Sequence, residues 1–259
     1  PMIYETIRYA VRDDVAIVQL NRPDVMNALS TQMRAEITHA AKRAPEEARV
    51  LVLTGKGRAF CSGQDLGDRA SIAATDLERT LRDEYVPMIR AVAECPVPTI
   101  AAVNGPAAGA GANLALAADV VIASDAAMFL QAFARIGLIP DAGGTYYLPR
   151  QIGLARAMGA ALFAEPVTAR QAAEWGMIWE AVDEARFADA WWARARTLAA
   201  GPTATYRNIK RALRAGLSND LEAQLLLEAE LQGELGTTHD FREGVLAFLE
   251  KRDARFEGR

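Results

Sequence analysis

Three glycine-containing loops, each placed directly after apolar strand-like sequence, constrain the fold of this 259-residue chain most strongly. The segments 49–54, 99–103 and 120–129 supply that sequence, and the first two have the apolar composition of strands buried on both faces. The loops 59–66, 104–114 and 137–145 carry glycines, which let a backbone turn close to a ligand. Strand–loop–helix units of this kind repeat through the first two-thirds of the chain and predict an α/β fold.

The remaining pattern predicts one hairpin and a series of helices. Segments 3–11 and 15–20 are expected to be strands joined at Asp13-Asp14, and Ser30 is placed to cap a helix that ends near Arg43. Because helices dominate the last third, we expect a core of residues 1–200 and a C-terminal helical region of residues 201–259, although a plain helix–helix turn would also explain the boundary. The other expected helices lie at 76–93, 112–118, 155–162, 169–175, 186–199, 203–215, 221–235 and 241–250.

Composition and charge exclude several classes of protein. The formal net charge of −4 argues against nucleic-acid binding. No apolar run approaches the roughly 20 residues that span a bilayer, and no signal-peptide pattern opens the sequence. The two cysteines, Cys61 and Cys95, are too few for a disulfide framework or a zinc site, which favours a reducing cytoplasm and no bound metal. His39 and His239 lie outside the glycine loops, so histidine is disfavoured as a catalytic base.

The glycine loops suggest a site for a carbonyl oxygen. Two converging backbone N–H groups can stabilise negative charge that develops on such an oxygen. None of the loops carries the lysine pattern of a P-loop or the glycine pattern of a dinucleotide-binding turn. Taken singly, each loop is more readily explained as a structural turn, so the order and spacing of all three carry the signal.

In that order and spacing the motifs resemble the crotonase (enoyl-CoA hydratase/isomerase) superfamily. They are Asn21-Arg22-Pro23 with Asn27-Ala28-Leu29, AFCSGQDL at 59–66, AAVNGPAAGAG at 101–111 and GLIPDAGGT at 137–145. The resemblance implies a spiral of repeated ββα units with a C-terminal helical trimerisation region. It also implies CoA-thioester substrates, no separate cofactor, and assembly as a homotrimer or homohexamer. The apolar helix at 221–235 agrees with self-association, or it packs on the core of its own chain.

The resemblance places an oxyanion hole at the backbone N–H groups of Gln64 and Ala110. Asn113 and Phe133 stand where the hydratases of the superfamily carry two glutamates, and neither side chain can activate water or take up a proton at neutral pH. Asp141 is then the candidate base, because burial among apolar neighbours would raise its pKa and one carboxylate suffices to move a proton between two carbons. Alternatively, Asp141 caps the following helix or stays solvated.

Other site residues follow from the same resemblance. Arg22, Lys56 and Arg58 could meet the CoA phosphates or could be solvated surface cations, and Asp65 could hold its own loop through hydrogen bonds. Lys251 and Phe256 would reach CoA across a subunit boundary, where the C-terminal region would also cover the pocket. The substrate pocket is expected to include Asn113, Ala108, Gly109, Phe133, Ile139 and Pro140, and the CoA site Arg22, Ala59, Cys61, Ser62, Asp65, Leu66, Lys251 and Phe256.

Within the superfamily the chain is most similar to the oxepin-CoA-forming 1,2-epoxyphenylacetyl-CoA isomerases of phenylacetate catabolism. The similarity rests on FCSGQDL at 60–66, GAGANLALAAD at 109–119, YYLPR at 146–150 and FREGVLAFLEKR at 241–252. It implies isomerisation of a ring epoxide to an oxepin and of 3-enoyl-CoA to 2-enoyl-CoA, with Asp141 shuttling the proton. Two alternatives stay open: an enoyl-CoA hydratase of fatty-acid β-oxidation in which Asp141 replaces the glutamates, and a non-catalytic acyl-CoA-binding protein.

Overall fold

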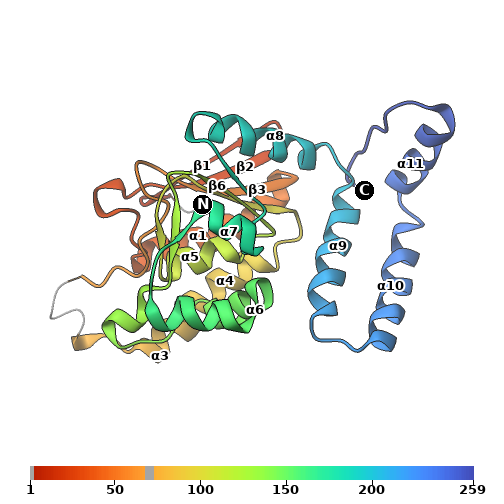
Figure 1. Cartoon of the computed structure of the whole chain (residues 1–259). Coiled ribbons are helices and arrows are strands. Elements are labelled where there is room, and N and C mark those ends of the chain that lie inside the picture. The colour runs from red at the N-terminus through yellow and green to blue at the C-terminus, as the bar shows by residue number, and fades with distance from the viewer. Residues whose placement is uncertain (1–2, 68–72) are drawn as a thin grey trace.

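The computed structural model describes residues 3–67 and 73–259 and is built around a six-stranded sheet (Figure 1). The strand order is β1-β2-β3-β4-β6-β9. β1 and β2 are antiparallel, and every other neighbouring pair is parallel. The strands are β1 (Ile7–Arg12), β2 (Val15–Leu20), β3 (Val50–Gly55), β4 (Thr99–Val103), β6 (Val120–Ser124) and β9 (Glu180–Val182).

A smaller sheet brings two of the glycine loops together. Its strands are β5 (Ala107–Ala108), β7 (Met128–Leu130) and β8 (Val167–Thr168), with β5 parallel to β7 and β7 antiparallel to β8. The Gly109 N–H donates to the Leu130 carbonyl at 2.8 Å, which continues the β5–β7 pairing. The end of the second loop therefore lies beside the segment that leads into the third.

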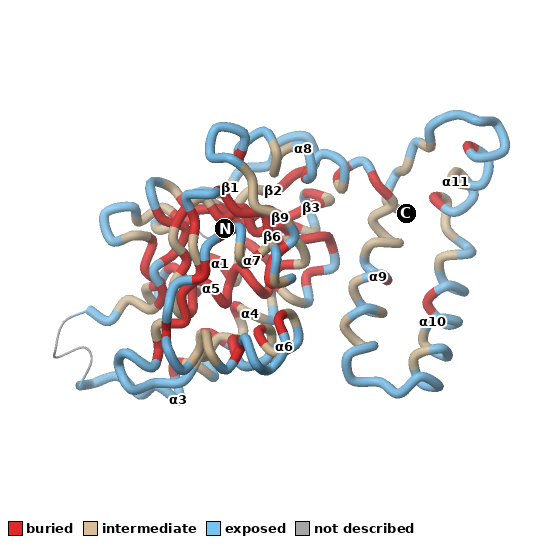
Figure 2. Tube along the Cα trace, in the orientation of Figure 1, coloured by how far each residue is buried: buried red, intermediate tan, exposed pale blue. Residues whose placement is uncertain are grey.

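Alternate residues of the central strands face helices on opposite sides of the large sheet. Leu51 and Leu53 of β3 belong to the main core with α1 (Thr31–Glu47), α4 (Val86–Ala93) and α5 (Ala110–Leu116). Val50 and Val52 pack into a second cluster with α8 (Phe187–Ala199). All six residues of β3 are buried, so the prediction of a strand covered on both faces is confirmed (Figure 2).

Local signals account for the hairpin and the first long helix. Asp13 and Asp14 both have positive φ angles, 52° and 64°, as a two-residue hairpin turn requires. The Ser30 hydroxyl accepts a hydrogen bond from the Met33 N–H at 3.2 Å, which confirms the predicted cap. The helix continues past Arg43 to Glu47, because its buried stripe extends through Ala44 and outweighs the loss of one donor at Pro45.

Other elements depart from the predicted boundaries. The first strand begins at Ile7, and the helix expected at 76–93 consists of α3 (Leu77–Thr80), a π-helical turn η2 (Leu81–Tyr85) and α4. The helix expected at 155–162 begins earlier, since α6 spans Gly144–Phe163 with a break at Gly153, where φ is +81°. The turns η1 (Pro23–Val25), η3 (Ala132–Ile136) and η4 (Glu184–Arg186) and the strands β5, β8 and β9 are too short to show a period, and α7 spans Ala169–Trp175 as predicted.

The C-terminal helices α9 (Thr203–Gly216), α10 (Leu221–Leu235) and α11 (His239–Glu250) lie beside the core (Figure 1). Lys210 and Arg214 of α9 each form an ion pair with Asp119 at 2.8 Å and so anchor this helix to the core. The predicted division near residue 200 falls at the short link between α8 and α9 and stays a prediction. Within the described ranges, no helix is both long and apolar enough to cross a membrane.

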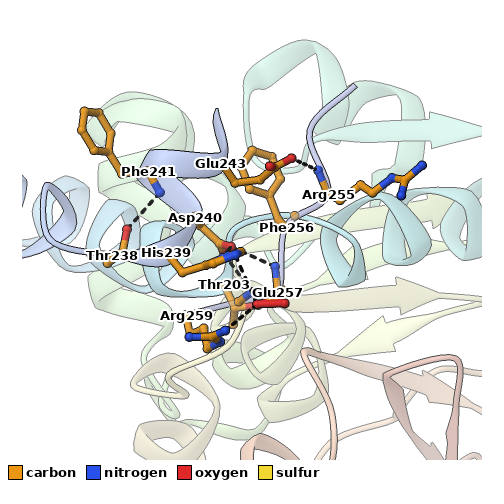
Figure 3. A network of polar contacts seen from close by, with 12 residues as sticks. Thr203, Thr238, His239, Asp240, Phe241, Glu243, Arg255, Phe256, Glu257 and Arg259 are labelled. Carbon is orange, nitrogen blue, oxygen red and sulfur yellow. Dashed lines mark hydrogen bonds and ion pairs between the residues drawn. The ribbon is translucent and has the colours of Figure 1, made fainter. Parts of the chain in front are cut away.

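The C-terminal tail folds back on α11 through a buried carboxylate (Figure 3). Asp240 accepts hydrogen bonds from the N–H groups of Glu257 at 2.9 Å and Gly258 at 2.7 Å, and its own N–H donates to the Arg259 carbonyl. The His239 ring lies within 3.0 Å of Asp240 and 3.4 Å of Glu257. His239 therefore belongs to a structural network at the tail.

Candidate active site

A cavity of about 270 Å³ opens where the three glycine loops converge. Its lining is mostly apolar, and Asp141 is the one carboxylate among the described residues that form it. An apolar cavity with few polar groups is the usual form of a small-molecule site. The lining residues are Ser62, Gly63, Gln64, Leu66, Gly109, Ala110, Ala132, Phe133, Arg135, Ile136, Leu138 and Asp141.

The first loop presents the backbone N–H of Gln64 away from its neighbouring segment. The Leu29 N–H donates to Gly63 at 2.7 Å, and the Asp65 N–H donates to Leu29 at 3.1 Å. In this parallel bridge the N–H of Gln64 points in the opposite direction. Gly63 has a φ of +98°, and a Cβ there would lie 2.9 Å from the Ala108 carbonyl oxygen, so the turn requires glycine.

The second N–H comes from the start of α5. Ala110 is the first residue of this helix and follows Gly109, whose φ is +56°. The first N–H groups of a helix have no acceptor within it. Within the described residues, no hydrogen-bond acceptor is found for the N–H of Ala110 or of Gln64. Both amides belong to residues of the cavity wall, so they are available to a carbonyl oxygen of a ligand.

Arg34 supports Leu29, whose backbone pairs with the first loop. This buried side chain of α1 donates to the Leu29 carbonyl at 2.6 Å and forms an ion pair with Glu84 at 2.7 Å. Arg34 also lies 4.7 Å from the centre of the Tyr85 ring. The π-helical turn places Glu84 and Tyr85 one after the other against α1, which links the cavity wall to the core.

Asp141 has the environment expected of a proton acceptor. Its Oδ1 atom is buried and has no hydrogen-bond partner among the described residues. Burial raises the pKa of this carboxyl to about 6, and a hydrogen bond from its own backbone N–H opposes that shift. The N-cap of α6 is Gly143, with no side-chain hydrogen bond, so the alternative that Asp141 caps this helix is wrong.

Four residues predicted around the substrate lie outside the cavity lining. The Asn113 side chain is fully buried and its amide is bonded to Gln131 and to the Asp141 carbonyl. Ala108 belongs to the β5 backbone, and Ile139 is 74% exposed on the outer side of its loop. Pro140 lies with Asn113 against Gly144, behind the cavity. Direct contact of these four with a substrate stays a prediction.

The side chains predicted to bind CoA differ in their availability. Arg22 is paired with Asp65 at 2.9 Å and donates to the Ala28 carbonyl, and this pairing holds the pKa of Asp65 below its usual range. Asp65 therefore has the loop-holding role given as the alternative. Ser62 and Leu66 line the cavity, and Lys56 and Arg58 lie at or near the surface.

Ala59 and Cys61, the buried residues of the first loop that were predicted to bind CoA, could contact it only through backbone groups. The carbonyls of both residues already accept hydrogen bonds within the protein. The Ala59 carbonyl accepts from Asn27 at 3.0 Å and from Asn104 at 3.1 Å, and the Cys61 carbonyl accepts from Ala108. Burial raises the pKa of the Cys61 thiol to about 12. Lys251 ends α11, and Phe256 lies in the C-terminal tail, where its carbonyl accepts a hydrogen bond from Arg49, next to β3, at 3.5 Å. Their predicted contact across a subunit boundary stays a prediction.

The sequence reasoning placed Phe133 of η3 in the substrate pocket but missed the other residues of this turn. Ala132, Arg135 and Ile136 also line the cavity. Arg135 is held at its rim by a hydrogen bond to the Ala164 carbonyl at 2.7 Å. The apolar run AFARIGL at 132–138, directly before the third loop, is the signal that could have indicated this part of the cavity wall.

Residues 11–259 match the family described as enoyl-CoA hydratase/isomerase. The chain belongs to this family. Enzymes of the enoyl-CoA hydratase/isomerase family act on acyl-CoA thioesters, which agrees with paired amides in a cavity wall beside one carboxylate. Within residues 3–67 and 73–259, no group of three or more His, Cys, Asp or Glu is arranged to hold a metal ion.

Two relatives in the enoyl-CoA hydratase/isomerase family cover almost the whole chain. A Rhodobacter capsulatus protein named probable enoyl-CoA hydratase is 62% identical over 258 residues and covers 100% of both chains. The 1,2-epoxyphenylacetyl-CoA isomerase of Escherichia coli is 46% identical over 260 residues, which is 98% of this chain and 99% of that protein. The two names differ in the reaction that they state.

A solved structure confirms the predicted crotonase-type fold. The enoyl-CoA hydratase of Bacillus anthracis is 31% identical and superposes with a TM-score of 0.91 over 98% of this chain and 100% of that one. The agreement extends through the C-terminal helices, because nearly all residues of both chains are covered.

Proposed function

We propose that this enzyme isomerises CoA thioesters, with Asp141 as the proton shuttle and the N–H groups of Gln64 and Ala110 as the oxyanion hole. One observation carries the proposal: among the described residues that line it, the cavity has a single carboxylate, half-buried, with one buried oxygen that has no partner. The similarity to 1,2-epoxyphenylacetyl-CoA isomerase extends the proposal to ring-1,2-epoxyphenylacetyl-CoA, converted to oxepin-CoA in phenylacetate catabolism. No separate cofactor is required, because CoA is part of the substrate.

The proposed reaction on a 3-enoyl-CoA proceeds in two proton transfers. Asp141 removes a proton from the carbon next to the thioester carbonyl, and the electron pair moves onto the carbonyl oxygen. The N–H groups of Gln64 and Ala110 stabilise the resulting dienolate. Asp141 then returns the proton two carbons further along, on the same face, which leaves a conjugated 2-enoyl-CoA. A carboxyl with a pKa of about 6 can both accept and return a proton near neutral pH.

Hydration is the second candidate function, because the 62% identical relative bears the name probable enoyl-CoA hydratase. The resemblance to hydratases calls for two carboxylates around the attacking water. Here Phe133 places an aromatic ring in the cavity wall, and the buried amide of Asn113 is used in hydrogen bonds. Neither group can take a proton from water, which favours isomerisation.

The two candidates are separated by assaying the wild-type protein on a 3-enoyl-CoA and on crotonyl-CoA. Isomerisation creates a conjugated thioester that absorbs in the ultraviolet, whereas hydration of crotonyl-CoA removes one. We expect turnover of the 3-enoyl substrate with hydration at least about 100-fold slower, since a missing general base costs about 10²–10⁴ in rate. Fast hydration of crotonyl-CoA would show that the enzyme is a hydratase. Binding of both thioesters without turnover would show that the protein binds acyl-CoA without catalysis.

We also propose that the enzyme assembles as a homotrimer or homohexamer through its C-terminal region. Figure 2 shows α10 and α11 largely exposed and α9 largely intermediate, although all three carry large apolar side chains at exposed positions. Many exposed large apolar side chains in one region of a protein favour an association site there. Sedimentation equilibrium should give three or six times the mass of one chain, and a monomer at micromolar concentration would contradict the proposal. The exposed set includes Leu213, Leu217, Leu221, Leu225, Leu226, Phe241, Phe248 and Leu249.

Among the described residues, none of 201–259 lines the cavity, and α9 is anchored to the core at Asp119 instead. A covering role for residues 201–259 therefore requires a neighbouring subunit, which would also bring Lys251 and Phe256 to CoA. A cytoplasmic location is proposed on the two cysteines, both of which are free and buried.

A further inference from the structure

Two buried amide side chains form a reciprocal pair beside the cavity. Asn113 of α5 is 0% exposed, and Gln131, which follows β7, is 4% exposed. The Gln131 Nε2 donates to Asn113 Oδ1 at 2.8 Å, and Asn113 Nδ2 donates to Gln131 Oε1 at 3.2 Å. Burial of polar groups is costly unless they are bonded, so both amides have well-defined orientations.

The pair connects the two catalytic elements. Asn113 Nδ2 also donates to the backbone carbonyl of Asp141 at 2.8 Å. Asn113 lies three residues after Ala110 on α5, the helix that supplies one oxyanion N–H. One side chain therefore joins the element that holds the thioester oxygen to the residue that moves the proton. The distance between Asp141 and the start of α5 therefore depends on the hydrogen bond from Asn113 Nδ2.

The direction of the Asn113 amide is set by Gln131. Only the NH₂ group of Asn113 can donate to the Asp141 carbonyl, so its oxygen must point the other way. That oxygen is buried and requires a donor, which Gln131 Nε2 supplies. Without that donor, the amide could rotate and turn its oxygen toward the Asp141 carbonyl, where two acceptors would repel each other.

Close packing leaves little room for a different arrangement. A Cβ on Gly144 would lie 2.5 Å from Asn113 Nδ2, so the backbone that follows Asp141 touches the amide directly. A shift of Asn113 would therefore be transmitted to the Asp141 backbone. Displacement of a reacting group by about 1 Å can cost about 10²-fold in rate.

We propose that Gln131 is a positioning residue that acts through Asn113 to hold Asp141 at the correct distance from the oxyanion hole. The inference rests on the proposed isomerase function. It assigns to the amide pair a role in the chemical step and none in the binding of the thioester.

The test compares Gln131→Glu and Gln131→Met with wild type on a 3-enoyl-CoA. Glutamate keeps the shape but loses the donor, and methionine removes both hydrogen-bonding groups. We expect kcat to fall by about 10- to 100-fold with KM within about threefold. In the Asn113→Leu background, Gln131→Met should cause no further loss, because residues that act through one another are not additive.

A spectroscopic probe separates positioning from a general loss of structure. An aminophenyl-conjugated 2-enoyl-CoA absorbs at longer wavelength when its carbonyl oxygen accepts hydrogen bonds, so it reports the oxyanion hole alone. The shift should be the same in wild type and both Gln131 variants. Glu36→Gln serves as the matched control, because Glu36 is a buried polar residue that is bonded to the N–H groups of Glu5 and Thr6 and does not line the cavity. It should lower thermal stability and leave kcat unchanged.

Each outcome is decisive. Wild-type kcat in folded Gln131 variants, loss of the spectral shift together with kcat, or additive losses with Asn113→Leu would overturn the inference and leave the isomerase function standing. No isomerisation by the wild-type protein would instead contradict the proposed function, and the inference with it.

Discussion

Replacing Asp141 by asparagine is expected to lower kcat for isomerisation of a 3-enoyl-CoA by about 10³-fold, with little change in thioester affinity. Asparagine has the same size but cannot accept the proton, and a positioned general base contributes about 10²–10⁴ in rate. The oxyanion N–H groups of Gln64 and Ala110 belong to other segments and remain in place. Steady-state kinetics and equilibrium binding of a saturated acyl-CoA measure the two quantities separately.

Asp189→Asn is the matched control for this experiment. Asp189 is an exposed carboxylate in the first turn of α8, the helix that packs on the sheet face opposite α1. The same chemical change there should leave kcat within about twofold, since exposed substitutions have small effects. Turnover retained by Asp141→Asn would remove this residue from the mechanism.

The same substitution should change stability in a pH-dependent way. The pKa of Asp141 is raised from 3.8 to about 6 because burial disfavours the charged form. A folded protein with a raised carboxyl pKa loses stability as pH rises from 3.8 through 6, where the unfolded chain is already ionised. The raised pKa corresponds to about 3 kcal/mol at most, and solvent contact reduces this to roughly 1–2 kcal/mol.

Asp141→Asn is therefore expected to be more stable than wild type at pH 7–8 and equal to it below about pH 4. Thermal unfolding across this range measures the difference. Wild-type activity should rise with pH through about 6, as the carboxyl becomes able to accept a proton. An activity profile without this step would contradict the assignment of the base.

Replacing Gly63 by alanine is expected to lower kcat by about 10²–10³-fold, the effect of losing one oxyanion donor. The φ of +98° is strained for any residue with a Cβ, and that atom would lie 2.9 Å from the Ala108 carbonyl oxygen. The backbone must shift, which turns the Gln64 N–H away from the thioester. The absorbance of the bound aminophenyl-conjugated thioester should lose most of its shift to longer wavelength.

Gly159→Ala is the control for the glycine replacement. A Cβ at Gly159 of α6 would meet no atom within 4 Å, and a helical backbone accepts alanine. This variant should keep both kcat and the spectral shift. If Gly63→Ala also kept both, the Gln64 amide would not be part of the oxyanion hole.

Helices and strands were predicted correctly where the residues that stabilise them lie within the same short segment of sequence. Ser30 caps a helix because its hydroxyl meets an N–H three residues later, and β4 and α10 have the bounds that their sequence patterns indicated. The π-helical turn at 81–85 could not be predicted in this way. A π-helical turn adds one residue to a helix that otherwise keeps its apolar pattern. The position of this turn along the helix follows from the packing of Tyr85 against the core.

Some features of the candidate site could likewise be predicted from the sequence, and others could not. The order of the glycine loops, the identities of Asn113 and Phe133, and the carboxylate of Asp141 are covalent facts, so the sequence alone determined the family and the candidate base. The positive φ of Gly63 became visible only in the structure.

Tertiary structure alone decided how these parts work together. The hydrogen bonds of Asn113 to Gln131 and to the Asp141 carbonyl join segments that are 18 and 28 residues apart. The wall residues Ala132, Arg135 and Ile136 meet the oxyanion loops only in the folded chain. Desolvation and hydrogen-bond direction depend on which atoms of distant segments come into contact. A linear pattern carries no information about that contact until the chain is folded.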